Sequence, residues 1–308
     1  MVTRNAMTTT RRPGHAARHL LPPREGPGRI LQSIDRLEHT ASLDAMAFTL
    51  RRAVKGLPLG RLRDALHGRG LGHPFHPLSV QIPIGTWTSA TILDALPGQR
   101  IAARTLIGVG LASAAPAALA GWVDWAELRK PQMRVGLLHA ALNVTAVGLY
   151  SASLGVRIRG REGRGRALAL AGLTTVGLGG ALGAHMSFRQ AAGANQTEHI
   201  ATRVGDGWHP LGALTEFPVD QPVRRTVTDV PVVVVRDADD QVYVLADQCS
   251  HMAGPLSQGE LVDGCLQCPW HGSRFDLATG WNVAGPATAP QPAFETRTAA
   301  GQVQARLR

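Results

Sequence analysis

Four apolar runs without Asp, Glu, Lys or Arg dominate the first two thirds of this 308-residue chain. They are Leu78–Leu93, Thr105–Val123, Val135–Val156 and Ala167–Phe188. A helix rises about 1.5 Å per residue, so roughly 20 apolar residues cross a hydrocarbon core of about 30 Å. The last three runs reach that length, and the first is shorter and contains Pro83. Because buried helices of a soluble bundle need polar outer faces, we predict an all-α transmembrane four-helix bundle.

The segment before these runs divides into two parts. Residues 1–28 are rich in Arg, Thr and Pro without periodicity, which predicts a disordered basic tail. Apolar residues then recur at helical spacing at Ile30, Ile34, Leu37, Leu43, Ala47 and Leu50. Such an amphipathic helix either packs on other helices or lies in the membrane interface. The predicted membrane domain therefore spans residues 29–190 and begins with an amphipathic helix.

The distribution of basic residues predicts the orientation of the bundle. The formal charge is +10, and the arginines gather near the N-terminus and beside apolar runs, which suits membrane flanks and not nucleic acid. An even number of crossings places both ends of the membrane domain on one side. The basic N-terminal region together with Arg129, Lys130, Arg134 and Arg189 outweighs Arg100 and Arg104, although the arginines of the loop 157–166 oppose it. We therefore expect a multi-pass cell-membrane protein with a cytoplasmic C-terminal domain. Arg in place of Lys, with abundant Ala and Gly, is typical of a bacterial genome of high GC content.

The last hundred residues have the period of β-strands. Residues 191–204 are polar and small and are predicted to form a linker. Beyond them, two pairs of β-rich runs flank turns: Val232–Val235 with Val242–Leu245, and Phe294–Arg297 with Val303–Leu307. Residues 205–308 are therefore predicted to form an all-β domain.

Two short motifs in this domain carry the chemistry: Cys249-Ser-His251 and Cys268-Pro-Trp-His271. A [2Fe–2S] cluster with mixed ligation binds two Cys on one iron and two His on the other. It therefore needs one thiolate and one imidazole from each of two facing loops. A C-x-H motif, sixteen intervening residues and a C-x2-H motif supply this set. The four residues are predicted to bind the cofactor and its metal.

A zinc site is the main alternative in the same segment. Cys265-x2-Cys268 has zinc-knuckle spacing, and Cys249 or a histidine would complete four ligands. Zinc leaves the paired Cys–His motifs unexplained, and Cys265 is more simply a small residue beside the second loop. A disulfide from Cys265 has no partner outside the predicted ligand set.

The segments CSHMAGPL and CPWHGSRFDLATG resemble the two boxes of Rieske ferredoxin domains, over about residues 205–308. The resemblance implies a small β-sandwich with a cluster-binding subdomain. It also implies that Cys249 and Cys268 bind an inner iron, and that His251 and His271 bind an exposed outer iron.

The same resemblance implies differences from quinol-oxidising Rieske subunits. Those proteins usually add a disulfide between the boxes, where this chain has Ala253–Gly254 and Trp270. Phe275 stands where they carry a tyrosine that hydrogen-bonds a ligand sulfur, and Ser273 is retained. Fewer hydrogen bonds to sulfur favour the oxidised cluster, so we expect a lower reduction potential than in the respiratory type.

Ring-hydroxylating oxygenases also begin with a Rieske domain. They need a 2-His-1-carboxylate iron site in a large downstream domain. Fewer than forty residues follow His271, so an electron carrier without catalytic residues is expected here and not an autonomous oxygenase.

The membrane segment has a resemblance of its own. LHGRGLGHPFHPLSVQIPIGTWTSATILDAL, AGWVDWAEL and GLGGALGAHMSF are similar to an uncharacterised bacterial family of four-helix membrane domains, over about residues 25–190. Some members are fused to Rieske domains, and the family implies no established activity.

Ionisable residues within the predicted spans point to a second site, because they are rare in membranes and mark function. His139 and His185 lie about one turn inside the third and fourth spans, and Asp124, His73 and His76 approach from the same side. Asn143 shares the helix face of His139. Our hypothesis is that His139 and His185 ligate a b-type haem or frame a quinone pocket. Histidines hydrogen-bonded between helices and a non-haem metal site remain as alternatives.

These features together predict a membrane-anchored Rieske electron-transfer protein. It would carry single electrons between a membrane donor or acceptor and a redox partner protein or quinone, as a component of an oxidoreductase system. The alternatives are an Fe–S redox sensor, in which the oxidation state changes a contact, and a non-catalytic subunit of a larger oxidoreductase complex.

Overall fold

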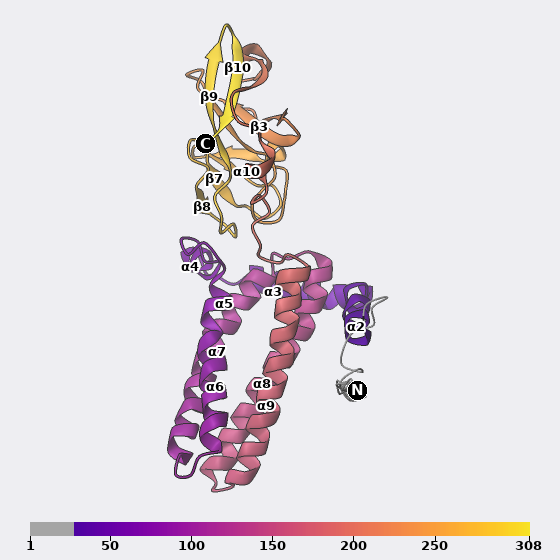
Figure 1. The fold of residues 1–308 in the computed structure, drawn as a ribbon, viewed down its shortest axis with the longest axis vertical. Coiled ribbons are helices and arrows are strands. Elements are labelled where there is room, and N and C mark those ends of the chain that lie inside the picture. The colour runs from indigo at the N-terminus through magenta and orange to yellow at the C-terminus, as the bar shows by residue number, and fades with distance from the viewer. Residues whose placement is uncertain (1–27) are drawn as a thin grey trace, which may run out of the picture.

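Helices make up the first part of the chain and strands the last part, and the two lie end to end (Figure 1). The computed structural model describes residues 28–308. The basic tail predicted over residues 1–28 therefore lies outside the described residues, apart from Gly28. The amphipathic helices and the β-domain lie at the same end of the elongated helical bundle.

The bundle is built from two helical hairpins, and shorter helices cover its β-domain end. The helical elements are α2 Arg29–Glu38, the 3-10 turn Ala41–Leu43, α3 Asp44–Lys55, α4 Arg61–Leu66, α5 Phe75–Ser79, α6 Gln81–Asp94, α7 Arg100–Trp125, α8 Lys130–Ile158, α9 Glu162–Ala184, the π-helical turn His185–Arg189 and α10 Ile200–Arg203.

Three helices among residues 28–308 are long and apolar enough to cross a membrane: Arg100–Trp125, Lys130–Ile158 and Glu162–Arg189. They coincide with the last three predicted spans. The first predicted span is divided between α5 and α6, and α6 has 14 residues. Pro83 lies in the first turn of α6 and has no N–H to donate to the preceding turn, which interrupts a continuous helix. The predicted count of four spanning helices is therefore not confirmed.

The two hairpins, α6–α7 and α8–α9, pack against each other through one buried cluster at the end away from the β-domain and another at the β-domain end. At the end away from the β-domain the rings of Trp87 and Tyr150 stack with centroids 4.2 Å apart and are buried. Gly110 and Gly172 lie against these rings, and a Cβ at either position would lie within 3.0 Å of them. Glycine thus permits the large aromatic contact between the two hairpins. At the β-domain end residues 126–129 join α7 to α8, and Trp125 donates to the carbonyl of Met133 at 3.0 Å.

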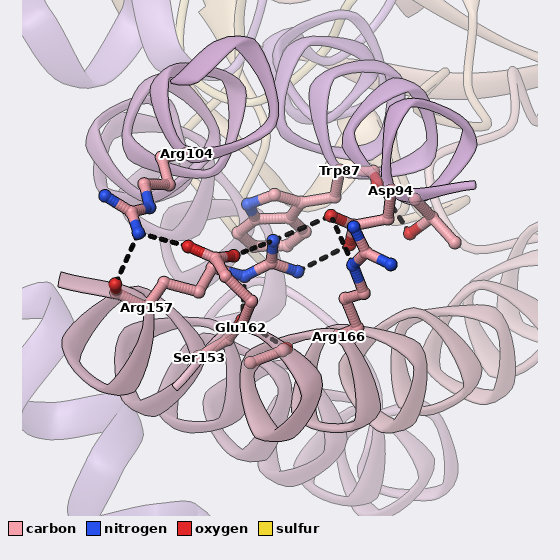
Figure 2. Close-up of polar contacts among 9 residues, drawn as sticks. Trp87, Asp94, Arg104, Ser153, Arg157, Glu162 and Arg166 are labelled. Carbon is pink, nitrogen blue, oxygen red and sulfur yellow. Dashed lines mark hydrogen bonds and ion pairs between the residues drawn. The ribbon is translucent and has the colours of Figure 1, made fainter. Parts of the chain in front are cut away.

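A group of charged and polar side chains around the buried Arg157, here called the distal charge cluster, lies at the end away from the β-domain (Figure 2). Its members come from four helices and are Asp94, Arg104, Ser153, Arg157, Glu162 and Arg166. Arg157 is fully buried and donates to both oxygens of Asp94, at 2.7 and 2.5 Å. Arg104 donates to Glu162 and to the carbonyl of Arg157. Each buried charge therefore has a partner of opposite sign on another helix or turn.

The predicted amphipathic helix is divided into α2 and α3 and is fixed to the bundle by α8. The guanidinium of Arg134 donates to both oxygens of Asp44, at 2.8 and 2.9 Å, and to the carbonyl of Glu38 at 2.6 Å. Ala47 is buried on α3, whereas Phe48 is 61% exposed. One face of α3 therefore packs on the bundle while an apolar side chain remains on the other.

The β-domain is a sandwich of two antiparallel sheets. The larger has the order β1-β10-β9-β4-β3-β2, and the smaller has the order β5-β6-β7-β8. The strands are β1 His209–Ala213, β2 Val223–Val227, β3 Val230–Arg236, β4 Val242–Ala246, β5 Glu260–Val262, β6 Cys265–Gln267, β7 Arg274–Asp276, β8 Asn282–Ala284, β9 Ala293–Ala299 and β10 Gln302–Leu307.

Both faces of β3 are buried, which explains its run of valines. Val232 and Val234 enter a core on one face, whereas Val233 and Val235 enter a second core that also contains Cys249 and Cys268. Alternate residues of a strand point to opposite faces, so a strand buried on both sides is apolar throughout. The two predicted hairpins, β3–β4 and β9–β10, are confirmed. Ile200, within the predicted linker, packs into the first core.

Candidate metal centre

The first predicted ligand loop follows β4 and closes on itself through its backbone. The N–H of Cys249 donates to the carbonyl of Gly254 at 2.8 Å, and the N–H of Ala253 donates to the carbonyl of Cys249 at 2.8 Å. Ala253 has φ +64°, a left-handed conformation that L-residues rarely adopt. Such strain persists where the surrounding structure requires it, and it often marks a functional loop.

The second loop, between β6 and β7, repeats the same frame. The N–H of Cys268 donates to the carbonyl of Ser273 at 2.8 Å, and the N–H of Gly272 donates to the carbonyl of Cys268 at 3.1 Å. Gly272 has φ +72° and corresponds to Ala253, four residues after the cysteine. The two loops are therefore equivalent in backbone structure. The histidine lies two residues after the cysteine in the first loop and three residues after it in the second.

The two cysteine sulfurs face each other and are buried. The Cys249 thiol donates to the Cys268 sulfur, which together with backbone N–H groups of Trp270 and His271 lowers the pKa of Cys268. The same contact and burial raise the pKa of Cys249, which is 1% exposed. Backbone N–H groups of His251 and Met252 also point at the Cys249 sulfur. Each sulfur thus sits in a nest of N–H donors that stabilises negative charge.

The two imidazoles also converge. The ring centroids of His251 and His271 are 5.0 Å apart, with an interplanar angle of 86°. A ring centroid lies about 3 Å from a metal bound at about 2 Å, so imidazoles in adjacent positions of one ion have centroids about 5 Å apart. Burial lowers the pKa of His251 to about 3 and also lowers that of His271. Both rings are therefore neutral near pH 7 and can offer a lone pair to a metal.

One orphaned atom tests whether these residues fit an iron–sulfur cluster. Nδ1 of His251 is buried and has no hydrogen-bond partner. A buried polar atom without a partner is costly and requires an explanation. A metal bond at this nitrogen supplies one, and two thiolates with two imidazoles are the donor set of a Rieske centre. The residues present therefore fit the cluster.

The neighbouring glycine and cysteine have different roles. A Cβ on Gly254 would lie 3.0 Å from the sulfur of Cys268 and from the ring of Trp270, so glycine lets the two loops meet. The thiol of Cys265 instead lies 3.7 Å from the carbonyl of Asp263. Within residues 28–308 no three His, Cys, Asp or Glu side chains converge as a mononuclear zinc site requires. The predicted ligands form two pairs, as two irons need.

The ligand loops meet the helical domain. Arg129 donates to the carbonyl of Met252 at 2.8 Å, beside His251, and Arg69 donates to the carbonyl of Val283 at 2.5 Å. The charge of Glu127 raises the pKa of His271 and that of Lys55 lowers it, and these two residues form a 2.8 Å ion pair with each other. Both imidazoles thus lie close to the β-domain end of the bundle.

The structure gives the membrane histidines different partners. Nε2 of His185 lies 2.8 Å from a carboxylate oxygen of Glu38. His139 instead donates through Nδ1 to the carbonyl of Gly179 at 2.8 Å, and its ring meets that of His76 edge-on, with centroids 6.2 Å apart. His73 makes a 2.8 Å contact with the carbonyl of Pro74.

Sequence reasoning missed one buried histidine. Nδ1 of His67 lies 2.9 Å from Asp124, and His67 is 2% exposed. His67 precedes a glycine-rich stretch outside the apolar runs, so neither hydropathy nor periodicity indicates that it is buried. Its place beside Asp124 depends on how α4 folds back over the end of α7.

Comparison with known proteins identifies both domains. Residues 207–295 match the model of the Rieske [2Fe-2S] domain family, and residues 72–196 match that of a predicted membrane protein, DUF2231. The anthranilate 1,2-dioxygenase ferredoxin subunit of Burkholderia cepacia is 39% identical over 97 residues, covering 32% of this chain and 89% of that protein. Ferredoxin CarAc of Metapseudomonas resinovorans is 37% identical over 83 residues, covering 26% of this chain and 77% of that protein.

A solved structure is also similar to the β-domain. The ferredoxin of carbazole 1,9a-dioxygenase from Nocardioides aromaticivorans IC177 is 28% identical, covers 32% of this chain and 99% of that one, and has a TM-score of 0.31. The ferredoxin subunits are matched over most of their length at more than 30% identity. Through its β-domain the chain therefore belongs to the Rieske [2Fe-2S] family, here joined to a DUF2231 membrane-protein domain.

Proposed function

We propose that this protein is a membrane-anchored carrier of single electrons, with a [2Fe–2S] cluster held by Cys249, Cys268, His251 and His271. The observation that carries the proposal is the pair of equivalent loops, each presenting one buried sulfur and one neutral imidazole. A Rieske cluster supplies reversible one-electron chemistry at a potential set by its ligands and hydrogen bonds. The ferredoxin subunits similar to this domain support a role in electron transfer and not in catalysis.

The protein's own residues determine how easily the site accepts charge. Backbone N–H groups of His251, Met252, Trp270 and His271 surround the two cysteine sulfurs. Donors fixed in advance stabilise added negative charge without reorganisation, so reduction requires little structural change. Burial of both sulfurs keeps water away from them, whereas the imidazoles lie toward the helical domain.

We further infer that residues 29–190 form a multi-pass membrane anchor and residues 205–308 the electron-carrying domain. In this arrangement α5 and α6 together serve as the fourth crossing, which returns the chain to the side from which it started. More Arg and Lys residues lie in α2–α4 and in the segment 129–134 than in the two loops at the opposite end. The positive-inside bias then places the β-domain in the cytoplasm.

In inverted membrane vesicles we expect NADH to reduce the cluster and external ferricyanide to reoxidise it. NADH supplies electrons to membrane donors, and impermeant ferricyanide reaches only a domain on the outer face of the vesicle. EPR of frozen samples measures both steps. Right-side-out spheroplasts, reduced by endogenous substrates, are the control and should keep the reduced signal. A cluster that dithionite reduces but NADH never does would contradict a carrier and favour the sensor.

Phe275→Tyr is expected to raise the midpoint potential of the cluster. Phe275 is fully buried in the core that contains Cys249 and Cys268. The resemblance to Rieske domains implies that a tyrosine hydroxyl at this position bonds a ligand sulfur. A further O–H···S hydrogen bond stabilises the reduced, more negative cluster. EPR-monitored redox titration measures the shift. Phe275→Leu adds no donor and should leave the potential unchanged; an equal shift in both variants would refute this cause.

A further inference from the structure

The first ligand loop is held from outside the β-domain on both sides of His251. The guanidinium of Arg129, in the segment that joins α7 to α8, donates to the carbonyl of Met252 at 2.8 Å. The backbone N–H of Gln196, which follows the π-helical turn, donates to the carbonyl of Ser250 at 2.9 Å. Ser250 and Met252 are both buried. The loop therefore has a fixed position relative to the helical domain.

A second contact joins the two domains on the other side of the iron–sulfur site. Arg69 donates to the carbonyl of Val283 on β8 at 2.5 Å, and the N–H of Gly285 donates to Asp64 at 3.1 Å. Nε of Arg69 also lies 3.9 Å from a carboxylate oxygen of Asp64, so its charge has a partner of opposite sign. Both contacts thus place an arginine against a backbone carbonyl of the β-domain, but the charge of Arg69 is compensated.

Positive charges of the helical domain act on both imidazole ligands. Besides burial, which lowers the pKa of His251 and His271 most, the charges of Lys55 and Arg129 lower the pKa of both rings. Lys55 forms a 2.8 Å ion pair with Glu127, and the charge of Glu127 raises the pKa of His271. Within residues 28–308 Arg129 bonds a neutral carbonyl and has no carboxylate partner. Arg129 therefore carries an uncompensated charge that both imidazoles share.

The sign of this charge determines how it acts on the cluster. Reduction adds one negative charge to the iron–sulfur site, and a fixed cation nearby stabilises that charge. The bond from Arg129 to the Met252 carbonyl also holds the Met252 peptide, whose N–H points at the Cys249 sulfur. Arg129 is exposed on its solvent side, so salt weakens its electrostatic effect. The arrangement thus favours the reduced state, most strongly at low ionic strength.

We propose that Arg129 is a tuning residue of the iron–sulfur site: its positive charge, held against the first ligand loop, raises the reduction potential of the cluster. This inference rests on the proposed carrier function, because it needs a cluster at the four ligands. The helical domain then has two roles, since it anchors the β-domain and also sets the driving force for the electron that this domain carries. Movement of the loop away from Arg129 lowers the potential and favours release of the electron to an acceptor.

EPR-monitored redox titration of the detergent-purified full chain tests the assignment. Arg129→Gln removes the charge and keeps an N–H donor for the Met252 carbonyl. The equilibrium constant for reduction should fall about tenfold, a shift of about 59 mV to lower potential for a one-electron couple. The shift should shrink between about 0.01 M and about 1 M salt, because the Debye length falls from about 30 Å to about 3 Å. Arg129→Lys keeps the charge and should retain the wild-type potential.

Arg69→Gln is the matched control, because it alters the other arginine–carbonyl contact between the domains and leaves Arg129 in place. It should leave the potential unchanged. Equal shifts in Arg69→Gln and Arg129→Gln would assign the effect to domain docking and overturn the role of the charge. A shift in Arg129→Lys as large as in Arg129→Gln, or no shift in Arg129→Gln, would also overturn it.

Iron content and the EPR line shape, recorded on the same samples, separate this inference from the proposed function. Variants with full iron content and an unchanged line shape show that the site is intact, so that a shifted potential reports on charge. A wild type that binds the cluster at a potential independent of Arg129 loses the tuning role and keeps the carrier function. A wild type without iron or signal contradicts the carrier function and the tuning role together.

Discussion

Cys268→Ser is expected to abolish the rhombic EPR signal of the reduced protein and to remove essentially all of its bound iron. The Cys268 sulfur is buried, faces Cys249, and receives N–H donors from the next residues of its loop. A serine hydroxyl has a much higher pKa and is a harder ligand, so it cannot replace a thiolate in an iron–sulfur site. Iron analysis and EPR of anaerobically purified protein measure the loss.

Cys265→Ser is the matched control for this experiment. Cys265 lies three residues away on β6, is also buried, and contacts only the carbonyl of Asp263 among the polar contacts of its sulfur. We expect full iron content and an unchanged EPR signal. Loss of metal in Cys265→Ser together with retention in Cys249→Ser would exclude the proposed ligand set and revive the zinc-knuckle interpretation.

Arg157→Met is expected to destabilise the membrane domain by about 3 kcal/mol, because removing one partner leaves a buried charge uncompensated. Arg157 is fully buried and holds both oxygens of Asp94, which is itself 8% exposed. Arg166 is the remaining cation near Asp94, but it is half-exposed and stays 3.8 Å away. Unfolding in SDS, followed by tryptophan fluorescence, measures the change because Trp87 stacks on Tyr150 close to this cluster.

Two further variants show whether the unpaired charge is the cause. Arg159→Met removes an exposed arginine two residues away and should leave stability unchanged. The double variant with Asp94→Leu and Arg157→Met removes both charges, and it should recover most of the loss. A double variant as unstable as Arg157→Met would indicate lost packing instead.

The ligand motifs were readable from the sequence because their chemistry is local. One Cys and one His within three residues, occurring twice, predicts the donor set from residue identity and spacing alone. The loop frame was not readable: nothing in the amino-acid sequence shows that Ala253 adopts φ +64° or that it corresponds to Gly272. These features arise from backbone hydrogen bonds that form only when the two loops meet.

The membrane domain shows the same division between local and tertiary information. Hydropathy located the three long helices, but Pro83 and the short α6 show that an apolar run need not form one continuous helix. Arginine counting treated Arg157 as a residue of an exposed basic loop, whereas it is fully buried against Asp94. Charge pairing between α6 and α8 depends on tertiary packing, which sequence periodicity does not contain.

The distal charge cluster has a mechanical consequence for the whole molecule. Its ion pairs tie α6 to α8 and α7 to the start of α9, so charge pairing as well as packing holds that end of the bundle together. At the other end the short segment 126–129 joins α7 to α8, and Trp125 donates to the carbonyl of Met133 at 3.0 Å, so the two hairpins are tied together at both ends. Arg129 in that segment holds the loop of His251, which anchors the ligand loop to a stiff support.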